Sequence, residues 1–294
     1  MMSIPTAAKA LPDPRLPIGI FDSGVGGLTV FDAIQRLLPG EDLLYLGDTA
    51  RVPYGTRSPS TVIRYAQRVS GHLVNRGIKA LVVACNTAST WALKELETAG
   101  AQLGIPVLGV IKPGVTEALA RTQSNHIGVI GTEGTIRGGR YTAEMASLNT
   151  DVRVSGVACP LFVSLAEEGW TQGEVARLTA HRYLDELVDG PDTLILGCTH
   201  FPLLTSVIQE VLPNINIINS ATATANRLQQ LLADRKLHHP RPDRTEISHR
   251  FLVTDNLQRF ARVGSRFLSA APDPIELVDI ADHDDLQLTA GGAG

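Results

Sequence analysis

Two cysteines, Cys85 and Cys198, are the residues whose type and placement best fit acid–base chemistry in this chain. Each closes a short apolar run and precedes a polar segment with threonine: Ala80-Leu-Val-Val-Ala-Cys-Asn-Thr-Ala-Ser and Thr193-Leu-Ile-Leu-Gly-Cys-Thr-His. Apolar runs this short, bounded by glycine and small polar residues, are typical of buried parallel strands. Each thiol would then lie at the carboxyl end of a strand, which is the edge that faces the ligand crevice in open α/β sheets. Two thiols at equivalent edges predict a paired acid and base.

The elements that must position these thiols form two βαβ series. Ile18-Gly-Ile of the first series matches Ile127-Gly-Val of the second at an offset of 127 − 18 = 109 residues, and the two cysteines differ by 198 − 85 = 113. These similar offsets favour two related lobes, whereas a chance likeness between ordinary α/β units is the alternative. The sequence predicts strands at 18–21, 43–46, 80–84, 107–110, 127–132, 152–157, 193–196 and 251–255, and helices at 27–38, 60–75, 173–187, 221–233 and 257–268.

We therefore predict an α/β fold of two similar lobes. Each lobe would be a mostly parallel sheet flanked by helices, and a pseudo-twofold axis would relate the lobes, with the active site between them. The predicted divisions are a disordered tail at 1–15, a discontinuous first lobe at 16–112 and 222–281, a second lobe at 113–221, and a flexible C-terminus at 282–294.

Composition excludes several classes of protein. Of the 294 residues 44% are hydrophobic and 19% are charged, which is ordinary for a folded globular chain. The net charge of −4, with dispersed Lys and Arg, gives no electrostatic signature of nucleic-acid binding, and no apolar run reaches the roughly 18 to 20 residues of a membrane span. Three cysteines do not make a disulfide framework. We expect a cytoplasmic protein that binds a small molecule and neither nucleic acid nor membrane.

The segment Phe21-Asp-Ser-Gly-Val-Gly-Gly-Leu-Thr has the position of a dinucleotide-binding fingerprint, after a strand and before a helix. Asp48 closes the next strand, where a ribose ligand belongs, but Thr29 occupies the third glycine position and would obstruct the packing of helix on strand. The alternative is a turn whose N–H groups approach a smaller anion such as a carboxylate, with Ser23 adding a hydroxyl. Asp22 is either a local turn residue or a partner of one thiol.

The cysteines also raise two other kinds of chemistry. Cys85, Cys159, Cys198 and His200 are four potential metal ligands, but they form no C-x-x-C pair, so we expect no metal site. Cys159, before a proline, fits a buried hydrophobe, whereas Cys85 and Cys198 are each expected to begin a polar helix. A nucleophilic hydrolase or amidotransferase with Cys198 as nucleophile and His200 as base would leave the second thiol without a role.

Four motifs in this order resemble bacterial glutamate racemases over residues 18–268: Asp22-Ser-Gly-Val-Gly-Gly-Leu, Asp48-Thr-Ala-Arg-Val-Pro-Tyr-Gly, Ala84-Cys-Asn-Thr-Ala-Ser and Leu196-Gly-Cys-Thr-His-Phe-Pro-Leu. Tyr141 and Ala158-Cys-Pro-Leu-Phe-Val lie between them. The resemblance implies an isomerase that interconverts L- and D-glutamate without a cofactor or metal, supplies D-glutamate for peptidoglycan, and forms a homodimer.

The resemblance also implies roles for individual residues. Cys85 would abstract the α-proton of D-glutamate with help from Asp22, and Cys198 that of L-glutamate with help from His200. Glu167 is similar to a further acidic residue near the second cysteine, although a solvated helical carboxylate is the alternative. The implied substrate contacts are Asp22, Ser23, Tyr54, Gly55, Asn86, Thr87, Thr199 and His200, with Thr132 and Thr135 as additions.

The chain differs from the resembled family at two positions. Ser164 and Asn219 stand where many relatives have Pro and Asp. Aspartate racemases tend to have Glu where this chain has His200, so the residue favours glutamate. The alternatives are a racemase for another amino acid such as aspartate, a nucleotide-dependent oxidoreductase, and a non-catalytic amino-acid-binding or regulatory protein.

Overall fold

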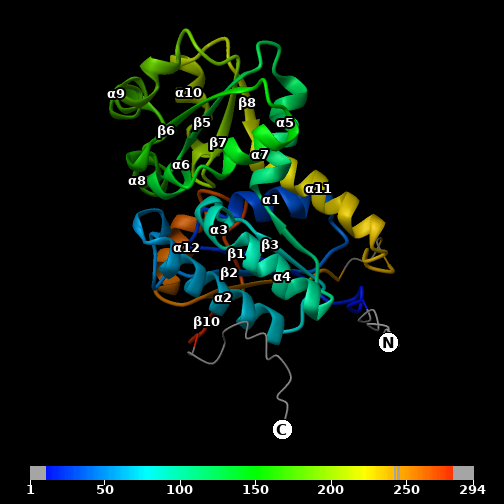
Figure 1. Ribbon diagram of the computed structural model, residues 1–294. Coiled ribbons are helices and arrows are strands. Elements are labelled where there is room, and N and C mark those ends of the chain that lie inside the picture. Colours follow the sequence, from blue (N-terminus) through cyan, green and yellow to red (C-terminus); the bar gives the residue numbers. More distant parts are fainter. Residues whose placement is uncertain (1–10, 242, 244–245, 281–294) are drawn as a thin grey trace, which may run out of the picture.

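The computed structural model describes residues 11–241, 243 and 246–280, which form two separate parallel sheets (Figure 1). The larger sheet has the order β10-β9-β2-β1-β3-β4 and the smaller one the order β6-β5-β7-β8, and every pair of neighbouring strands is parallel. The strands are β1 (Ile18–Asp22), β2 (Leu43–Gly47), β3 (Ala80–Val83), β4 (Val107–Gly109), β5 (His126–Gly131), β6 (Arg153–Ala158), β7 (Thr193–Gly197), β8 (Asn216–Asn219), β9 (His249–Val253) and β10 (Ile275–Leu277).

The two sheets repeat one topology. The order β2-β1-β3-β4 in the larger sheet corresponds to β6-β5-β7-β8 in the smaller one, with β1 matched to β5 and β3 to β7. The strands that precede Cys85 and Cys198 therefore occupy the same place in their sheets, each beside the first strand of its series. The prediction of an α/β fold with two similar lobes is confirmed.

Helices cover both faces of the larger sheet, because its central strands alternate between two apolar clusters. Ile20 of β1 packs in one cluster with Phe31 and Leu228, and the next residue, Phe21, packs in the other with Val69. The helices are α1 (Leu28–Leu37), α2 (Pro59–Asn75), α3 (Asn86–Trp91), α4 (Leu93–Leu103), α5 (Ile111–Arg121), α6 (Glu133–Arg137), α7 (Arg140–Leu148), α8 (Pro160–Glu168), α9 (Gly173–Leu184), α10 (Thr205–Val211), α11 (Ser220–Asp234) and α12 (Leu257–Gly264). Three short 3-10 helices are η1 (Tyr54–Thr56), η2 (Asp185–Leu187) and η3 (Phe201–Leu204).

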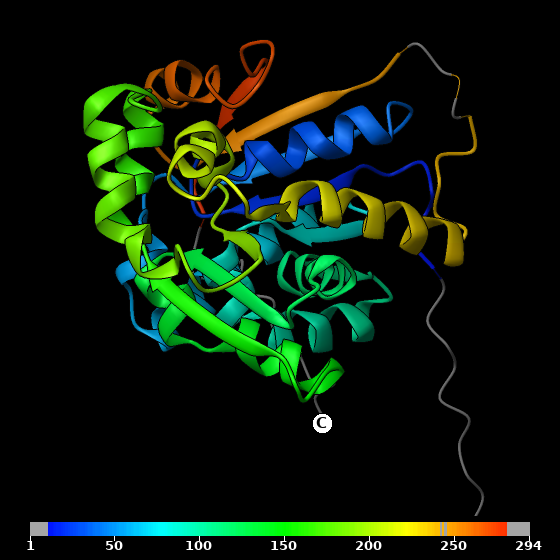
Figure 2. The same cartoon turned by 90° about the horizontal axis from the view of Figure 1, so that it is seen from above.

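Two helices carry the chain between the lobes. Pro113 lies in the first turn of α5, where a missing N–H disturbs no helical hydrogen bond, and α11 lies along α1 (Figure 2). The predicted divisions at 112/113 and 221/222 thus fall inside helices, and the domain limits stay a prediction. Of the predicted tails, residues 1–10 and 282–294 lie outside the described residues, while the Pro14 carbonyl accepts a hydrogen bond from Lys79 Nζ at 2.8 Å.

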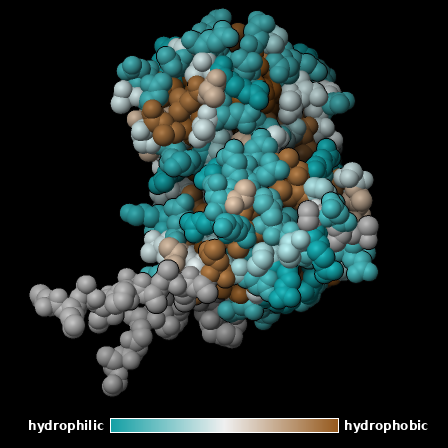
Figure 3. Space-filling model, turned by 90° about the vertical axis from the view of Figure 1, so that its right-hand side faces the viewer, coloured by the Kyte–Doolittle hydropathy of each residue, from teal (hydrophilic) through white to brown (hydrophobic). Residues whose placement is uncertain are grey.

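Hydrophilic residues cover most of the face drawn in Figure 3, and its hydrophobic residues form small separate patches. Within the described part of the chain, no helix combines the length and the apolar character that crossing a membrane requires.

Candidate functional site

Cys85 and Cys198 line the same cavity, which has a volume of about 170 Å³ and lies between the two lobes. Eight other residues that the sequence predicted for the site line it too: Ser23, Tyr54, Gly55, Asn86, Thr87, Thr132, Thr199 and His200. Asp22, Glu167 and Thr135, which the sequence also predicted, do not line it. Several of them directly follow β1, β3 or β7, because the carboxyl ends of these strands meet at this cavity. The sequence thus placed the cavity correctly at the edges of the two sheets.

Cys85 is a buried thiol at the start of α3. Its Sγ accepts a hydrogen bond from the Ala88 N–H and donates one to Ser23 Oγ, both at 3.5 Å. Burial raises the pKa of Cys85 to about 12, and the negative charge of Asp22 acts in the same direction. At neutral pH the Cys85 thiol therefore keeps its proton.

Asp22 ends β1 and is buried behind Cys85. Its Oδ1 accepts a hydrogen bond from the Gly24 N–H at 2.9 Å, while Oδ2 is buried and has no hydrogen-bond partner among the described residues. Burial raises the pKa of this carboxyl above its ordinary value. One oxygen therefore serves the local turn, the other has no partner among the described residues, and Asp22 does not line the cavity.

Cys198 has a different setting from Cys85. A turn and η3 separate it from α10, so it does not begin an α-helix as predicted, because Pro202 and its neighbours adopt 3-10 geometry first. His200 supplies its polar partner instead: Nδ1 lies 3.9 Å from Cys198 Sγ, and the Phe267 ring packs edge-on against the imidazole at 5.4 Å between ring centroids.

Glu167 holds the other side of this imidazole. Its Oε1 lies 3.1 Å from His200 Nε2, so the pair matches the predicted association rather than a solvated carboxylate. Burial alone would lower the pKa of His200, but the hydrogen bonds with Cys198 and Glu167 outweigh it and raise the pKa to about 10. Burial would raise the pKa of Glu167, yet its contacts with His200 and Arg259 leave it lowered. His200 is therefore an imidazolium at neutral pH.

Sequence reasoning missed Arg259, whose guanidinium donates to Glu167 Oε2 at 2.7 Å. It lies 92 residues from Glu167 on α12, and nothing in the sequence distinguishes it from other arginines on exposed helices. Tyr141 was noted only as part of a motif; its hydroxyl accepts a hydrogen bond from Asn86 Nδ2 at 2.8 Å and fixes that amide.

Hydroxyl groups from both lobes meet at one end of the cavity. Thr87 Oγ1 lies 2.9 Å from Thr132 Oγ1 and 3.2 Å from Thr135 Oγ1. Tyr54, which lines the cavity, donates through its hydroxyl to the buried Asp48 at 2.6 Å. The described lining residues include no Lys or Arg. Hydroxyl and N–H groups would therefore have to bind any carboxylate here.

The glycine-rich turn after β1 lies directly against the other lobe. A Cβ added at Gly26 would lie 2.4 Å from atoms of His200 and Thr199. Thr29 points away from β1, since its hydroxyl donates to the Thr199 carbonyl at 3.0 Å, so it does not obstruct helix packing as predicted. The small residues of this turn therefore allow the lobes to approach each other beside the cavity.

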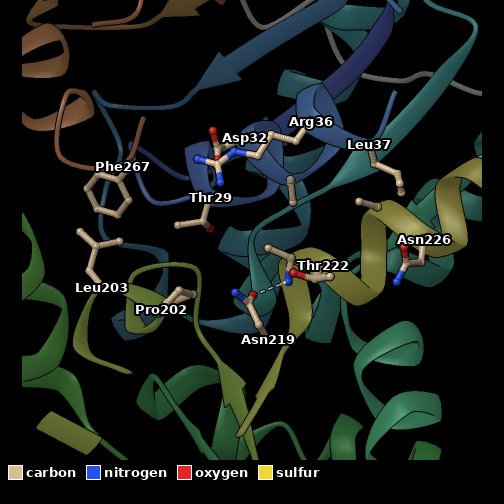
Figure 4. Close-up of a pocket in the computed structure, with 13 residues that line it drawn as sticks. Thr29, Asp32, Arg36, Leu37, Pro202, Leu203, Asn219, Thr222, Asn226 and Phe267 are labelled. Atoms are coloured by element: carbon tan, nitrogen blue, oxygen red, sulfur yellow. Dashed lines mark hydrogen bonds and ion pairs between the residues drawn. The ribbon is translucent and has the colours of Figure 1, made fainter. Parts of the chain in front are cut away.

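A larger hollow of about 530 Å³ lies on the other side of this interlobe contact (Figure 4). Its labelled side chains come from α1, η3, the end of β8, α11 and the segment after α12, and Figure 4 shows Thr29 and Asn219 among them. Neither Cys85 nor Cys198 lines it, so its size alone does not make it the catalytic cavity.

The remaining residues of interest have simple structural roles. Cys159 is fully buried, as predicted. Its thiol also donates a weak hydrogen bond to the Val157 carbonyl at 3.7 Å. Ser164 lines the cavity, and Asn219 Oδ1 caps α11 by accepting from the Ala221 N–H at 2.9 Å. No group of three or more His, Cys, Asp or Glu side chains placed to hold a metal ion occurs within the described residues.

Comparisons with known proteins agree with this geometry. Residues 18–228 match the profile of the Asp/Glu/Hydantoin racemase family. The chain is 52% identical over 257 residues to a glutamate racemase of Geobacter metallireducens, covering 87% of this chain and 93% of the relative. It is 46% identical over 276 residues to one of Chlorobium phaeobacteroides, covering 91% and 97%. A glutamate racemase from Francisella tularensis, solved in complex with D-glutamate, superimposes with a TM-score of 0.85 at 35% identity, covering 91% and 98%. The chain therefore belongs to the Asp/Glu/Hydantoin racemase family and is an isomerase.

Proposed function

We propose that this protein interconverts L-glutamate and D-glutamate by a two-base mechanism with Cys85 and Cys198 as the bases. The observation that carries the proposal is that both thiols line one cavity from equivalent strand ends of two lobes. A single amino acid in that cavity would meet one sulfur on each face of its Cα. The relatives named glutamate racemase, and the complex of one of them with D-glutamate, support glutamate as the substrate.

One thiolate and one thiol are required in each turnover. With L-glutamate, the Cys198 thiolate removes the α-proton, the C–H electron pair stays on Cα as a carbanion, and the Cys85 thiol donates its proton to the opposite face. Cys198 is then protonated and Cys85 is a thiolate, which is the state needed for D-glutamate. The total number of protons on the two thiols does not change.

The two thiols have different electrostatic surroundings. The Cys85 thiol is protonated at neutral pH, and the His200 imidazolium stabilises negative charge on the Cys198 sulfur. Turnover of D-glutamate starts from the opposite form, so the Cys85 thiol must lose its proton and the Cys198 thiolate must gain one, which the neighbouring His200 imidazolium can donate. The Oδ2 of Asp22, which has no hydrogen-bond partner among the described residues, provides a place for the Cys85 proton.

The hydrogen-bond donors that line the cavity fit the rest of the reaction. Carboxylates would be bound by hydroxyls such as Thr87 and Thr132 and by backbone N–H groups, which also stabilise charge that spreads from Cα into the α-carboxylate. A buried cavity strengthens these interactions, because little water competes for the donors.

Circular dichroism of L- and D-glutamate in deuterated buffer tests this mechanism. We expect racemisation without added cofactor, with one solvent deuteron at Cα of the product from the first turnover in either direction. Cys85→Ala and Cys198→Ala should each abolish racemisation, whereas Cys159→Ala, a matched change outside the cavity, should retain it. Return of the original proton, activity in either of the first two variants, or turnover of aspartate alone would contradict the proposal.

We also propose a setting for this activity: a cytoplasmic homodimer that supplies D-glutamate for peptidoglycan. Rescue of a D-glutamate-requiring bacterium by the wild-type chain, and not by Cys85→Ala, tests the supply role. Sedimentation of the purified protein tests the dimer.

A further inference from the structure

Glu167 lies between two cationic side chains that belong to different lobes. Its Oε1 contacts His200 and its Oε2 accepts from Arg259 at 2.7 Å. Arg259 is on α12, which packs through Phe260 into the core of the larger sheet, whereas α8 packs through Phe162 into the core of the smaller sheet. The Arg259–Glu167 ion pair therefore joins the two lobes beside the catalytic cavity.

This interlobe ion pair is connected by side-chain contacts to Cys198 and not to Cys85. From Arg259 the contacts run through Glu167 and His200 to Cys198 Sγ. Within the described residues, the Nε2 of His200 has its hydrogen bond with Glu167 alone. If Glu167 turned away, the buried imidazole would lose the contact that fixes its ring and favours its charged form.

The solvent exposure of Arg259 and Glu167 is consistent with an ion pair that can form and break. The Arg259 side chain is 48% exposed and the Glu167 side chain 17%. If the lobes separated, the guanidinium would pass into water without leaving a buried charge behind. The carboxylate would lose the partner that sets its direction toward His200.

We propose that Arg259 is a positioning residue for Cys198: its ion pair with Glu167 forms as the lobes close and holds Glu167 against His200. The His200 imidazolium would then be held beside Cys198 only in the closed enzyme. This inference deepens the proposed racemase mechanism and rests on it.

The substitution Arg259→Gln tests the inference, with Arg262→Gln as the matched control. Arg262 is exposed on the same helix, and no ion pair is found for it among the described residues. We expect Arg259→Gln to lower kcat/KM by about tenfold or more, with Tm unchanged, and Arg262→Gln to match wild type. The loss must be equal for L- and D-glutamate, because enantiomers have equal free energies. The primary isotope effect should rise more with α-deuterated L-glutamate, whose deuteron goes to Cys198.

The alkaline pH profile separates positioning from a simple charge effect. If Arg259 positions Glu167, its loss removes support from the imidazolium, and the alkaline fall in kcat/KM moves to lower pH. If Glu167 stayed in place, removing a nearby positive charge would move that fall to higher pH. Arg259→Lys, which keeps the charge but not the planar fork, should restore only part of the activity.

A double-mutant cycle completes the test. In a Glu167→Gln background, Arg259→Gln should have little further effect on kcat/KM, because both changes act through one contact. Additive losses, an alkaline shift to higher pH, or wild-type activity of Arg259→Gln would overturn the inference while the racemase proposal stands. Absence of glutamate racemisation by the wild-type chain would instead overturn both.

Discussion

Replacing Gly26 by alanine tests whether the close approach of the two lobes determines activity. The added Cβ would lie 2.4 Å from the Nδ1 and Cε1 atoms of His200 and from Thr199 Oγ1. Ordinary contacts begin near 3.4 Å, so these groups would have to move by about 3.4 − 2.4 = 1.0 Å. Gly26 is not among the residues with positive φ, so this contact, and not backbone strain, accounts for the effect.

A displacement of this size is enough to impair catalysis. Misplacing a catalytic group by about 1 Å costs on the order of 100-fold in rate. That factor corresponds to about 2.7 kcal/mol of lost transition-state stabilisation. We therefore expect Gly26→Ala to lower kcat/KM about 100-fold in both directions. Because the clash lies between the lobes and outside their apolar cores, Tm should change little.

Gly24→Ala is the matched control in the same turn. Its Cβ would lie 3.3 Å from Cγ2 of Val52, a side chain that needs to shift by only a few tenths of an ångström. We expect this variant to stay within a few-fold of wild-type kcat/KM. Wild-type activity of Gly26→Ala, or an equal loss in Gly24→Ala, would refute the argument that the turn sets the position of His200.

Two further predictions concern ionisation and stability. The pKa of His200 is raised from 6.5 to about 10, because its hydrogen bonds outweigh its burial, so its charge adds stability that is fully present below about pH 6.5 and is lost as the pH rises through about 10. We expect kcat/KM to fall near the upper pH, and the fall to move lower in Glu167→Gln; an unchanged fall would contradict this account. Lys79→Met removes the buried ammonium group that pairs with Glu41 and leaves only the more exposed His238, whose Nδ1 lies 3.5 Å from Glu41 Oε1, as an ion-pair partner. We expect a loss of about 3 kcal/mol in urea unfolding, with kcat/KM retained because Lys79 precedes β3 at the end opposite the cavity. The exposed Lys94→Met should be neutral, and equal stability of the two variants would show that the buried pair contributes nothing.

The sequence predicted the elements that local apolar patterns define. β1, β3 and β7 lie within one residue of their predicted ends, since each is a short buried run closed by glycine or small polar residues. β8 and β10 were not predicted. The run Asn216-Ile-Ile-Asn is short and polar at both ends, and its pairing with β7, not its own pattern, makes it a strand.

The sequence predicted those site residues whose position depends on one strand and the few residues after it. Cys85 and Cys198 follow strands, so the fold class alone predicts that they face the crevice. Arg259 was not predictable in this way, because its partner lies on another lobe and the contact depends on how the lobes are set against each other. The same reason explains Thr29, whose hydroxyl meets the other lobe instead of the strand that precedes its helix.

The two halves of the site show where a duplicated fold must diverge to catalyse racemisation. By the strand offset, the counterpart of Asp22 is residue 22 + 109 = 131, which is Gly131; by the cysteine offset, the counterpart of Thr87 is residue 87 + 113 = 200, which is His200. A carboxylate thus stands beside the first thiol only, and an imidazolium beside the second only. Identical neighbours would favour the same protonation state on both sulfurs, whereas proton transfer across one Cα needs an acid and a base at the same time. The repeated topology brings both sulfurs to one cavity, and these two differences give them opposite charge environments.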